Sequence, residues 1–118
     1  MQLLFNFIRR YWLVIAAINL TLITVLSLTP LAELPTVPGT DKTHHFIAYG
    51  ALIFSVALRR PKRWLWIALF FFCWSGVIEL LQPYMNRYGE WLDLLANGTG
   101  LLCGIALAFI VEKLFLTK

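Results

Sequence analysis

Hydrophobic residues in this chain form long uninterrupted runs, and most charged residues stand between the runs. The charge-free stretches cover residues 11–32, 43–58, 64–78 and 94–111. The first and last are long enough to cross a bilayer as helices, at about 1.5 Å per residue. The second and third reach that length only if Asp41, Lys42 and Glu79 lie at the membrane boundary. Because the runs are continuous instead of alternating, they predict helices and not the strands of a barrel.

This pattern predicts an all-α membrane protein, a four-transmembrane-helix bundle in which residues 1–118 form a single transmembrane domain. We place its helices at about residues 11–30, 42–58, 64–82 and 93–112. Composition agrees, because 60% of the 118 residues are hydrophobic, 14% are charged, and the mean hydropathy is +0.76. A soluble domain of this size could not bury so much apolar side chain. The four spans also leave no room for a soluble enzyme module.

Basic residues predict the orientation of the bundle. Eight of the ten lie at the same ends of the predicted helices: Arg9, Arg10, Arg59, Arg60, Lys62, Arg63, Lys113 and Lys118. By the positive-inside rule, both termini and the Arg59–Arg63 loop are then cytoplasmic. The net charge of +4 follows from this topology, so we expect membrane lipids and no nucleic acid as partners.

Acidic residues gather toward the opposite side, and some of them lie within otherwise apolar helical sequence. Five of the six acids fall on that side, and only Glu112 is cytoplasmic. A carboxylate at the depth of Glu79 is unfavourable by about 2.5–3.5 kcal/mol on insertion scales. We therefore expect Glu79 to be paired, protonated or placed in a wet cavity.

The helix-embedded polar residues predict one outward-facing polar pocket. On the second span, His45 lies four residues after Asp41 and four before Tyr49, so all three share a face. Glu79 and Gln82 share a face on the third span before Pro83, and Asp93 and Asn97 share one on the fourth. The proposed pocket residues are Asp41, Lys42, His45, Tyr49, Glu79, Gln82, Arg87, Asp93 and Asn97. Three plainer interpretations stay open: an N-cap role for Asp41, snorkelling by Lys42, and a structural ion pair at Glu79.

Small residues recur every four positions on the fourth span, at Ala96, Gly100, Gly104 and Ala108. Such a stripe lets helices approach closely. We expect it to pack that helix against its neighbours and to bring Asp93 and Asn97 near Glu79 and His45. The Gly100 and Gly104 pair is also a GxxxG pattern, so an oligomer formed through these glycines is an alternative.

Between Ser27 and Gly104 the chain carries a series of short motifs. They are Ser27-Leu28-Thr29-Pro30, Asp41-Lys42-Thr43-His44-His45-Phe46, Tyr49-Gly50, Gly76-Val77-Ile78-Glu79-Leu80-Leu81-Gln82, Arg87, Glu90, Asp93-Leu94, Asn97 and Gly100. In their order and spacing they resemble the VanZ-like family of small bacterial membrane proteins, named for a teicoplanin-resistance protein. In the family's pattern the matching histidine is His45, not His44. The resemblance implies a four-helix, multi-pass protein of the bacterial cytoplasmic (inner) membrane, with a role in glycopeptide resistance or in the cell envelope.

Three functions fit these residues. The first is an accessory protein whose pocket recognises an anionic envelope headgroup or precursor, with Arg87 and Lys42 attracting it. The second is an intramembrane enzyme acting on a lipid-linked envelope substrate, with His45 as part of a general acid/base pair. The third is a small multidrug transporter. No catalytic motif is present, so we favour a non-enzymatic role. A metal site at His45, Glu79 and Asp93 is chemically conceivable, but no ligand-spacing motif supports it, and we expect no metal or cofactor.

Overall fold

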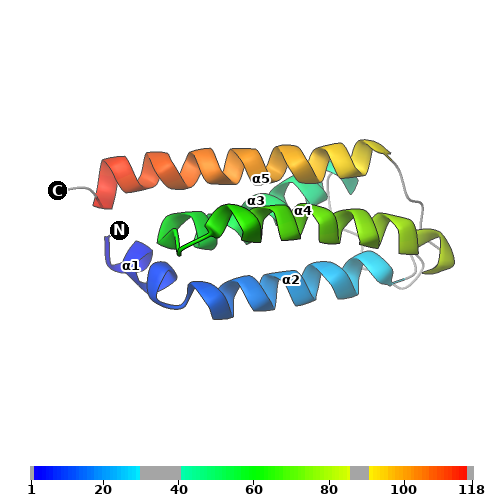
Figure 1. Cartoon of the computed structure of the whole chain (residues 1–118), viewed down its shortest axis with the longest axis horizontal. Helices are drawn as coiled ribbons and strands as arrows, with labels where there is room; N and C mark the ends of the chain where they lie inside the picture. Colours follow the sequence, from blue (N-terminus) through cyan, green and yellow to red (C-terminus); the bar gives the residue numbers. More distant parts are fainter. Residues whose placement is uncertain (1, 30–40, 86–90, 117–118) are drawn as a thin grey trace.

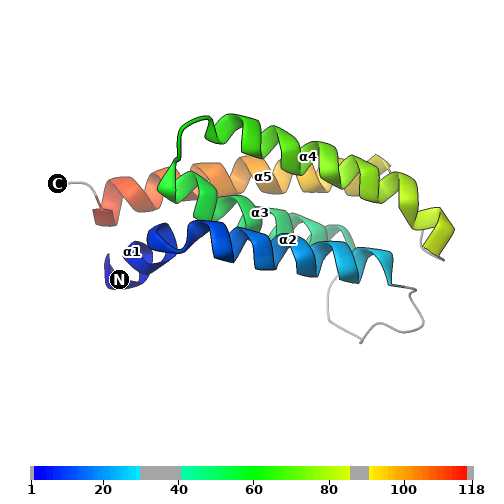
Figure 2. The ribbon, with the colours of Figure 1, turned by 60° about the horizontal axis from the view of Figure 1, so that its bottom comes forward.

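The computed structural model describes residues 2–29, 41–85 and 91–116, and every regular element in those ranges is a helix. The four longest helices run side by side along the length of the molecule (Figures 1 and 2). The start of the chain, the α3–α4 turn and the end of the chain lie together at one end. The elements are α1 (Gln2–Arg10), α2 (Trp12–Leu28), α3 (Asp41–Arg59), α4 (Trp64–Leu81), the 3-10 helix η2 (Gln82–Met85), α5 (Trp91–Val111) and the π-helix η3 (Glu112–Leu116).

Most helix bounds lie close to those predicted from the apolar runs. Helices α3, α4 with η2, and α5 correspond to the predicted helices at 42–58, 64–82 and 93–112. At Pro83, which lacks an N–H donor, the α-helical pattern gives way to η2. The predicted helix at 11–30 corresponds to α2, which ends at Leu28.

The pattern did not predict α1, which is bent by 76° relative to α2. Its Phe5 is buried against a cluster that includes Leu58 of α3 and Val111 of α5. This contact holds α1 across the end of the bundle, at an angle to α2. Arg9 and Arg10 form the last turn of α1, directly before the bend.

Helix α3 occupies the centre of the bundle. Its Leu52, Ile53 and Val56 are fully buried and pack with residues of α2, α4 and α5. The closest packing is between α3 and α5, where glycines let the two backbones touch. A Cβ atom built on Gly104 would lie only 2.5 Å from the Gly50 carbonyl oxygen, and one built on Gly100 would overlap the Phe46 carbonyl oxygen. Only glycine therefore fits at these two positions.

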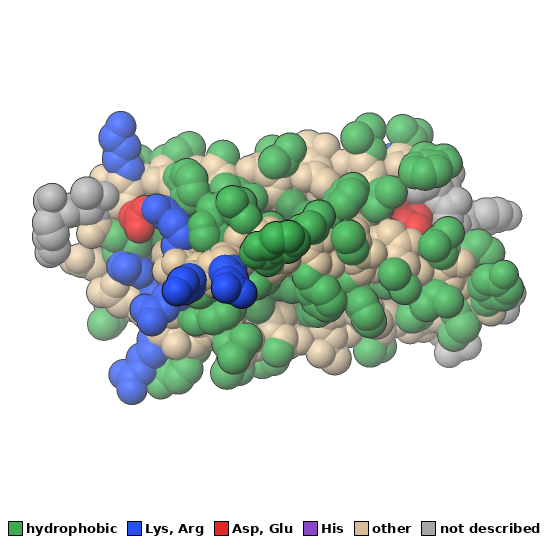
Figure 3. Space-filling model, viewed as in Figure 1, with side chains coloured by type: hydrophobic (Ala, Val, Ile, Leu, Met, Phe, Trp, Pro, Cys, Tyr) green, Lys and Arg blue, Asp and Glu red, His purple; other side chains and the backbone are tan. Residues whose placement is uncertain are grey.

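Large apolar side chains cover much of the molecule's surface along its length (Figure 3). Leu13 of α2, Leu65 of α4 and Leu102 of α5 are each more than 60% exposed. Such a surface suits lipid and not water. The segments Trp64–Met85 and Trp91–Leu116 are long and apolar enough to cross a membrane, and the bent pair α1–α2 is a third if it counts as one span. Four crossings stay a prediction.

Lys and Arg side chains gather at the end where the chain begins and ends (Figure 3). There Arg60 pairs with Glu112, and its guanidinium lies 4.3 Å from the centre of the Phe109 ring. Arg60 and Arg63 both adopt left-handed backbone conformations, with φ of 53° and 65°. The turn from α3 to α4 is therefore tight and strained, and it holds a basic cluster at this end of the bundle.

Candidate functional site

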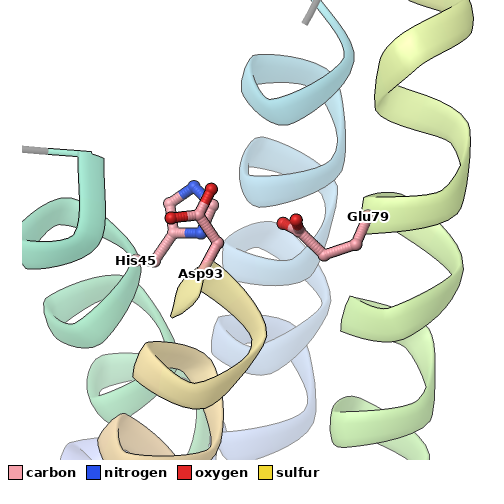
Figure 4. Close-up of side chains that lie close together, drawn as sticks. All are labelled: His45, Glu79 and Asp93. Carbon is pink, nitrogen blue, oxygen red and sulfur yellow. The ribbon is translucent and has the colours of Figure 1, made fainter. Parts of the chain in front are cut away.

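Three ionisable side chains from three helices meet near the end of the bundle opposite the basic cluster. His45 comes from the second turn of α3, Glu79 from the last turn of α4 and Asp93 from the first turn of α5. One ligand atom from each side chain can be chosen so that all three lie within 4.8 Å of one another. Figure 4 shows the Asp93 carboxylate beside the His45 ring and the Glu79 carboxylate pointing toward both. We call these three residues the polar cluster.

The polar cluster is largely shielded from solvent. Asp93 is 2% exposed and Glu79 is 9% exposed. Two carboxylates this close repel each other and lose hydration, so the site attracts positive charge. Part of that charge comes from Lys42, whose ammonium nitrogen lies 3.7 Å from Asp93 Oδ1 while its side chain remains 42% exposed. Lys42 therefore reaches from the surface to the edge of the cluster.

Further buried polar side chains lie one helical turn from the polar cluster. Gln82, three residues after Glu79, and Asn97, four residues after Asp93, are each 1% exposed. The Gln82 amide nitrogen donates to the Ser27 carbonyl oxygen of α2 at 3.1 Å. Gln82 Oε1 and Asn97 Oδ1 accept no hydrogen bond from the described residues. Tyr49, one turn after His45, is 2% exposed and interacts electrostatically with Glu79.

The remaining predicted residues divide into two groups. Arg87 lies outside the described residues, as does the side chain of Asp41, which is the first residue of α3. Gly100, Gly104 and Ala108 are buried, and Ala96 is half-buried. The two glycines lie against α3 of the same chain. That the predicted residues bind a ligand, and that copies of the chain associate through the glycines, stay predictions.

Sequence reasoning missed the contacts that fix α2 beside the polar cluster. The Trp74 indole nitrogen of α4 donates to the Thr24 hydroxyl of α2 at 2.9 Å, and the Ser27 carbonyl accepts from Gln82. A hydroxyl or an indole in an apolar helix is common, and spacing along the chain does not reveal its partner. Gly50 was also missed as the α3 partner of the small-residue stripe, because one glycine forms no repeat.

An apolar groove of about 770 Å³ runs between α4 and α5. Leu65 and Phe72 line it from α4, and Leu95 and Leu102 line it from α5. Trp91 and Leu92 lie at the end of the groove that adjoins Asp93 in sequence. The groove and the polar cluster are therefore neighbours, on two faces of the first turns of α5.

The fold and the site together define a helical membrane protein. All regular elements of the described residues are helices, large apolar side chains cover much of their surface, and the two carboxylates of the polar cluster are buried. The family comparison is more specific, because the model of the VanZ/LLP1 family matches residues 1–112. The chain belongs to this family, which is linked to glycopeptide resistance. No curated protein and no solved structure matches the chain.

Proposed function

We propose that residues 1–118 form one four-span domain in a bacterial cytoplasmic membrane, with both termini and the Arg59–Arg63 loop in the cytoplasm. Support comes from the arrangement of the helices, since α1, the α3–α4 turn and η3 lie at one end of the bundle (Figure 1). That end is also the basic one (Figure 3). Helix α5 has 21 residues and so extends about 31 Å, close to the thickness of the hydrocarbon core.

Cysteine accessibility tests this topology. In a background with Cys73 and Cys103 replaced by alanine, Lys62→Cys marks the basic turn and Tyr84→Cys marks the opposite end, where Tyr84 is 84% exposed. A membrane-impermeant maleimide applied to intact cells is expected to label Tyr84→Cys, and to label Lys62→Cys only after the membrane is opened. The reverse pattern would contradict the proposed orientation.

Within this topology, the protein acts as an accessory binding protein in glycopeptide resistance or cell-envelope function. The observation that carries this proposal is the convergence of His45, Glu79 and Asp93 from three helices at the outer end. Ionisable residues inside a membrane domain are energetically costly and therefore rare, and they commonly mark functional sites. Lys42, half-exposed at the edge of the cluster, is placed to attract the phosphate or carboxylate of an envelope headgroup or precursor.

The groove between α4 and α5 favours a ligand that carries a hydrocarbon chain. Its lining is almost entirely apolar and carries no charged side chain among the described residues, and Leu92 and Leu94 of that lining flank Asp93 in sequence. A lipid-linked envelope molecule has both parts, an anionic head for the cluster and an acyl or prenyl chain for the groove. We therefore take a lipid-linked anion as the ligand class.

Resistance measurements in cells test this function. Glu79→Gln and Asp93→Asn each remove one carboxylate of the cluster, and Glu112→Gln removes one at the basic end as a control. At equal protein level in the membrane, the first two are expected to lower teicoplanin resistance and the control to retain it. Unchanged resistance in both cluster variants would overturn the proposed role. Loss of protein from the membrane would instead favour a structural ion pair.

The second candidate function is an intramembrane enzyme, favoured by one observation. The His45 imidazole lies beside the Asp93 carboxylate, an arrangement that holds a general base in a fixed orientation (Figure 4). Purified protein mixed with envelope lipid phosphates distinguishes the two candidates. Release of product over many turnovers supports the enzyme, whereas stoichiometric binding without turnover supports the accessory role.

A further inference from the structure

The geometry points to a divalent-metal site of the zinc class formed by His45, Glu79 and Asp93. The inference concerns the same site as the proposed function and rests on it only for the anionic ligand that the metal would receive. The three donors come from α3, α4 and α5, are separated by 34 and 14 residues along the chain, and lie within 4.8 Å of one another. Such separations form no spacing motif, so the sequence left this donor set as a chemical possibility, and the structure brings the three side chains together.

The donor set selects the class of metal. One imidazole nitrogen and two carboxylate oxygens suit Zn²⁺ and the neighbouring first-row ions, whereas Mg²⁺ and Ca²⁺ prefer oxygen alone. Three protein ligands with a fourth position left open are the usual composition of zinc sites that receive water or a substrate oxygen. At this site the open position would accept the phosphate or carboxylate oxygen of the anionic ligand.

Charge and geometry both favour a dication in the polar cluster. Two carboxylates carry two negative charges at a site where Asp93 is 2% exposed, and one divalent ion neutralises both. Zinc binds such donors at about 2.0–2.2 Å, which places tetrahedral ligand atoms about 3.3–3.5 Å apart. The three donor atoms now lie within 4.8 Å of one another, so the largest of these separations must shorten by up to roughly 1.4 Å when zinc binds.

Gln82 and Asn97 provide a second, independent observation. Each is 1% exposed and lies one turn from a proposed ligand, and their amide oxygens accept no hydrogen bond from the described residues. A buried amide oxygen without a donor is energetically unfavourable. Water bound to a metal ion donates two hydrogen bonds, and such a water is the kind of donor that these oxygens lack. Outer partners of this kind orient metal sites in general.

The competing explanation is a metal-free ion-pair network. Lys42 lies 3.7 Å from Asp93, and a protonated His45 would balance the second carboxylate. The two explanations differ in what stabilises the protein. The network needs no added ion, whereas a metal site binds one equivalent of metal and gains stability from it.

Metal binding by the purified full-length chain in detergent tests the inference directly. After removal of metal with a chelator, the wild type is titrated with Zn²⁺ against a competing indicator, and with Co²⁺ while its visible absorption is recorded. We expect one equivalent of each and an absorption spectrum typical of four- or five-coordinate Co²⁺. His45→Ala and Glu79→Gln are expected to weaken Zn²⁺ binding at least tenfold, because loss of a mere outer-shell partner already weakens metal binding about 10–100-fold. His44→Ala, which changes the neighbouring histidine, is the matched control.

Every outcome of the titration decides for or against the metal site. One-to-one binding by the wild type and His44→Ala, together with weakened binding by His45→Ala, supports it. Absence of binding by folded wild type, or equal binding by wild type and His45→Ala, overturns it. If the variants do not fold, the wild type alone still decides, because Zn²⁺ should raise its melting temperature and chelator should lower it. Resistance that depends on the cluster without metal binding would overturn the metal site but leave the proposed function intact.

Discussion

Replacing Gly100 by alanine is expected to destabilise the bundle, because it forces α3 and α5 apart. A Cβ atom at Gly100 would overlap the Phe46 carbonyl oxygen and would lie 3.1 Å and 3.2 Å from the carbonyl carbon and Cα of the same residue. These are backbone atoms of a fully formed helix, so they do not rotate away as a side chain would. Ordinary contacts between carbon and a carbonyl oxygen are about 3.3–3.6 Å. The helices must therefore separate by roughly 1 Å at this point.

The expected loss in free energy of unfolding follows from the contacts between α3 and α5 that this separation weakens. A gap of 0.5–1 Å forfeits about a quarter to a half of the dispersion attraction between facing atoms. Overpacking of this kind is unfavourable by about 1–3 kcal/mol. Alanine in a helix recovers about 0.5–1 kcal/mol relative to glycine. The net loss in free energy of unfolding is therefore about 1 kcal/mol, within a range of about 0–2.5 kcal/mol.

Gly76→Ala is the matched control, since Gly76 lies in α4 and a Cβ atom there would meet nothing within 4 Å. Unfolding of the purified protein by heat or by SDS in mixed micelles measures both variants. We expect Gly100→Ala to be less stable than the wild type and Gly76→Ala to be equal or more stable. Equal stability of the two variants would refute the close contact between α3 and α5.

Three further predictions concern other parts of the molecule. A double-mutant cycle with Trp74→Phe and Thr24→Val is expected to give a coupling energy of about 0.6 kcal/mol in SDS unfolding, typical of interhelical hydrogen bonds in membranes; zero coupling would contradict the 2.9 Å contact. Arg63→Gly is expected to be more stable than Arg63→Ala by about 1 kcal/mol in free energy of unfolding, because φ is 65° at this position and alanine keeps the strain. A higher stability of Arg63→Ala would contradict that backbone conformation. Gln82→Ala is expected to lose about 1–3 kcal/mol in the same assay, because the buried Ser27 carbonyl loses its donor, and unchanged stability would argue against that hydrogen bond.

The sequence predicted the long helices well because their signals are local. Charges, prolines and the ends of apolar runs marked α3, α4 and α5 to within two residues. It did not predict α1, because the bend after Arg10 depends on the contact of Phe5 with Leu58 and Val111, which are far away in sequence. The first charge-free run begins at residue 11, after Arg9 and Arg10, so no helix was predicted before it.

The composition of the polar cluster was predictable, whereas its geometry was not. Helical spacing of four residues placed His45 and Asp93 on inward faces, and the unfavourable burial of Glu79 singled that residue out. How close the three side chains come depends on the rotation of three helices about their axes. That rotation depends on where Gly100 and Gly104 let α5 approach α3. On α3, the two glycines face the backbone of Phe46 and Gly50. From the sequence, a metal site at the same three residues was conceivable but was not favoured, because no ligand-spacing motif supported it.

If the polar cluster is the functional site, the adjacent residues His44 and His45 differ in their importance for function. Both residues lie on α3, and only His45 belongs to the cluster. The measurement is the teicoplanin susceptibility of cells that produce His45→Ala or His44→Ala at equal membrane levels. We expect His45→Ala to lose resistance and His44→Ala to retain it. Equal susceptibility of the two strains would contradict a functional role for the polar cluster.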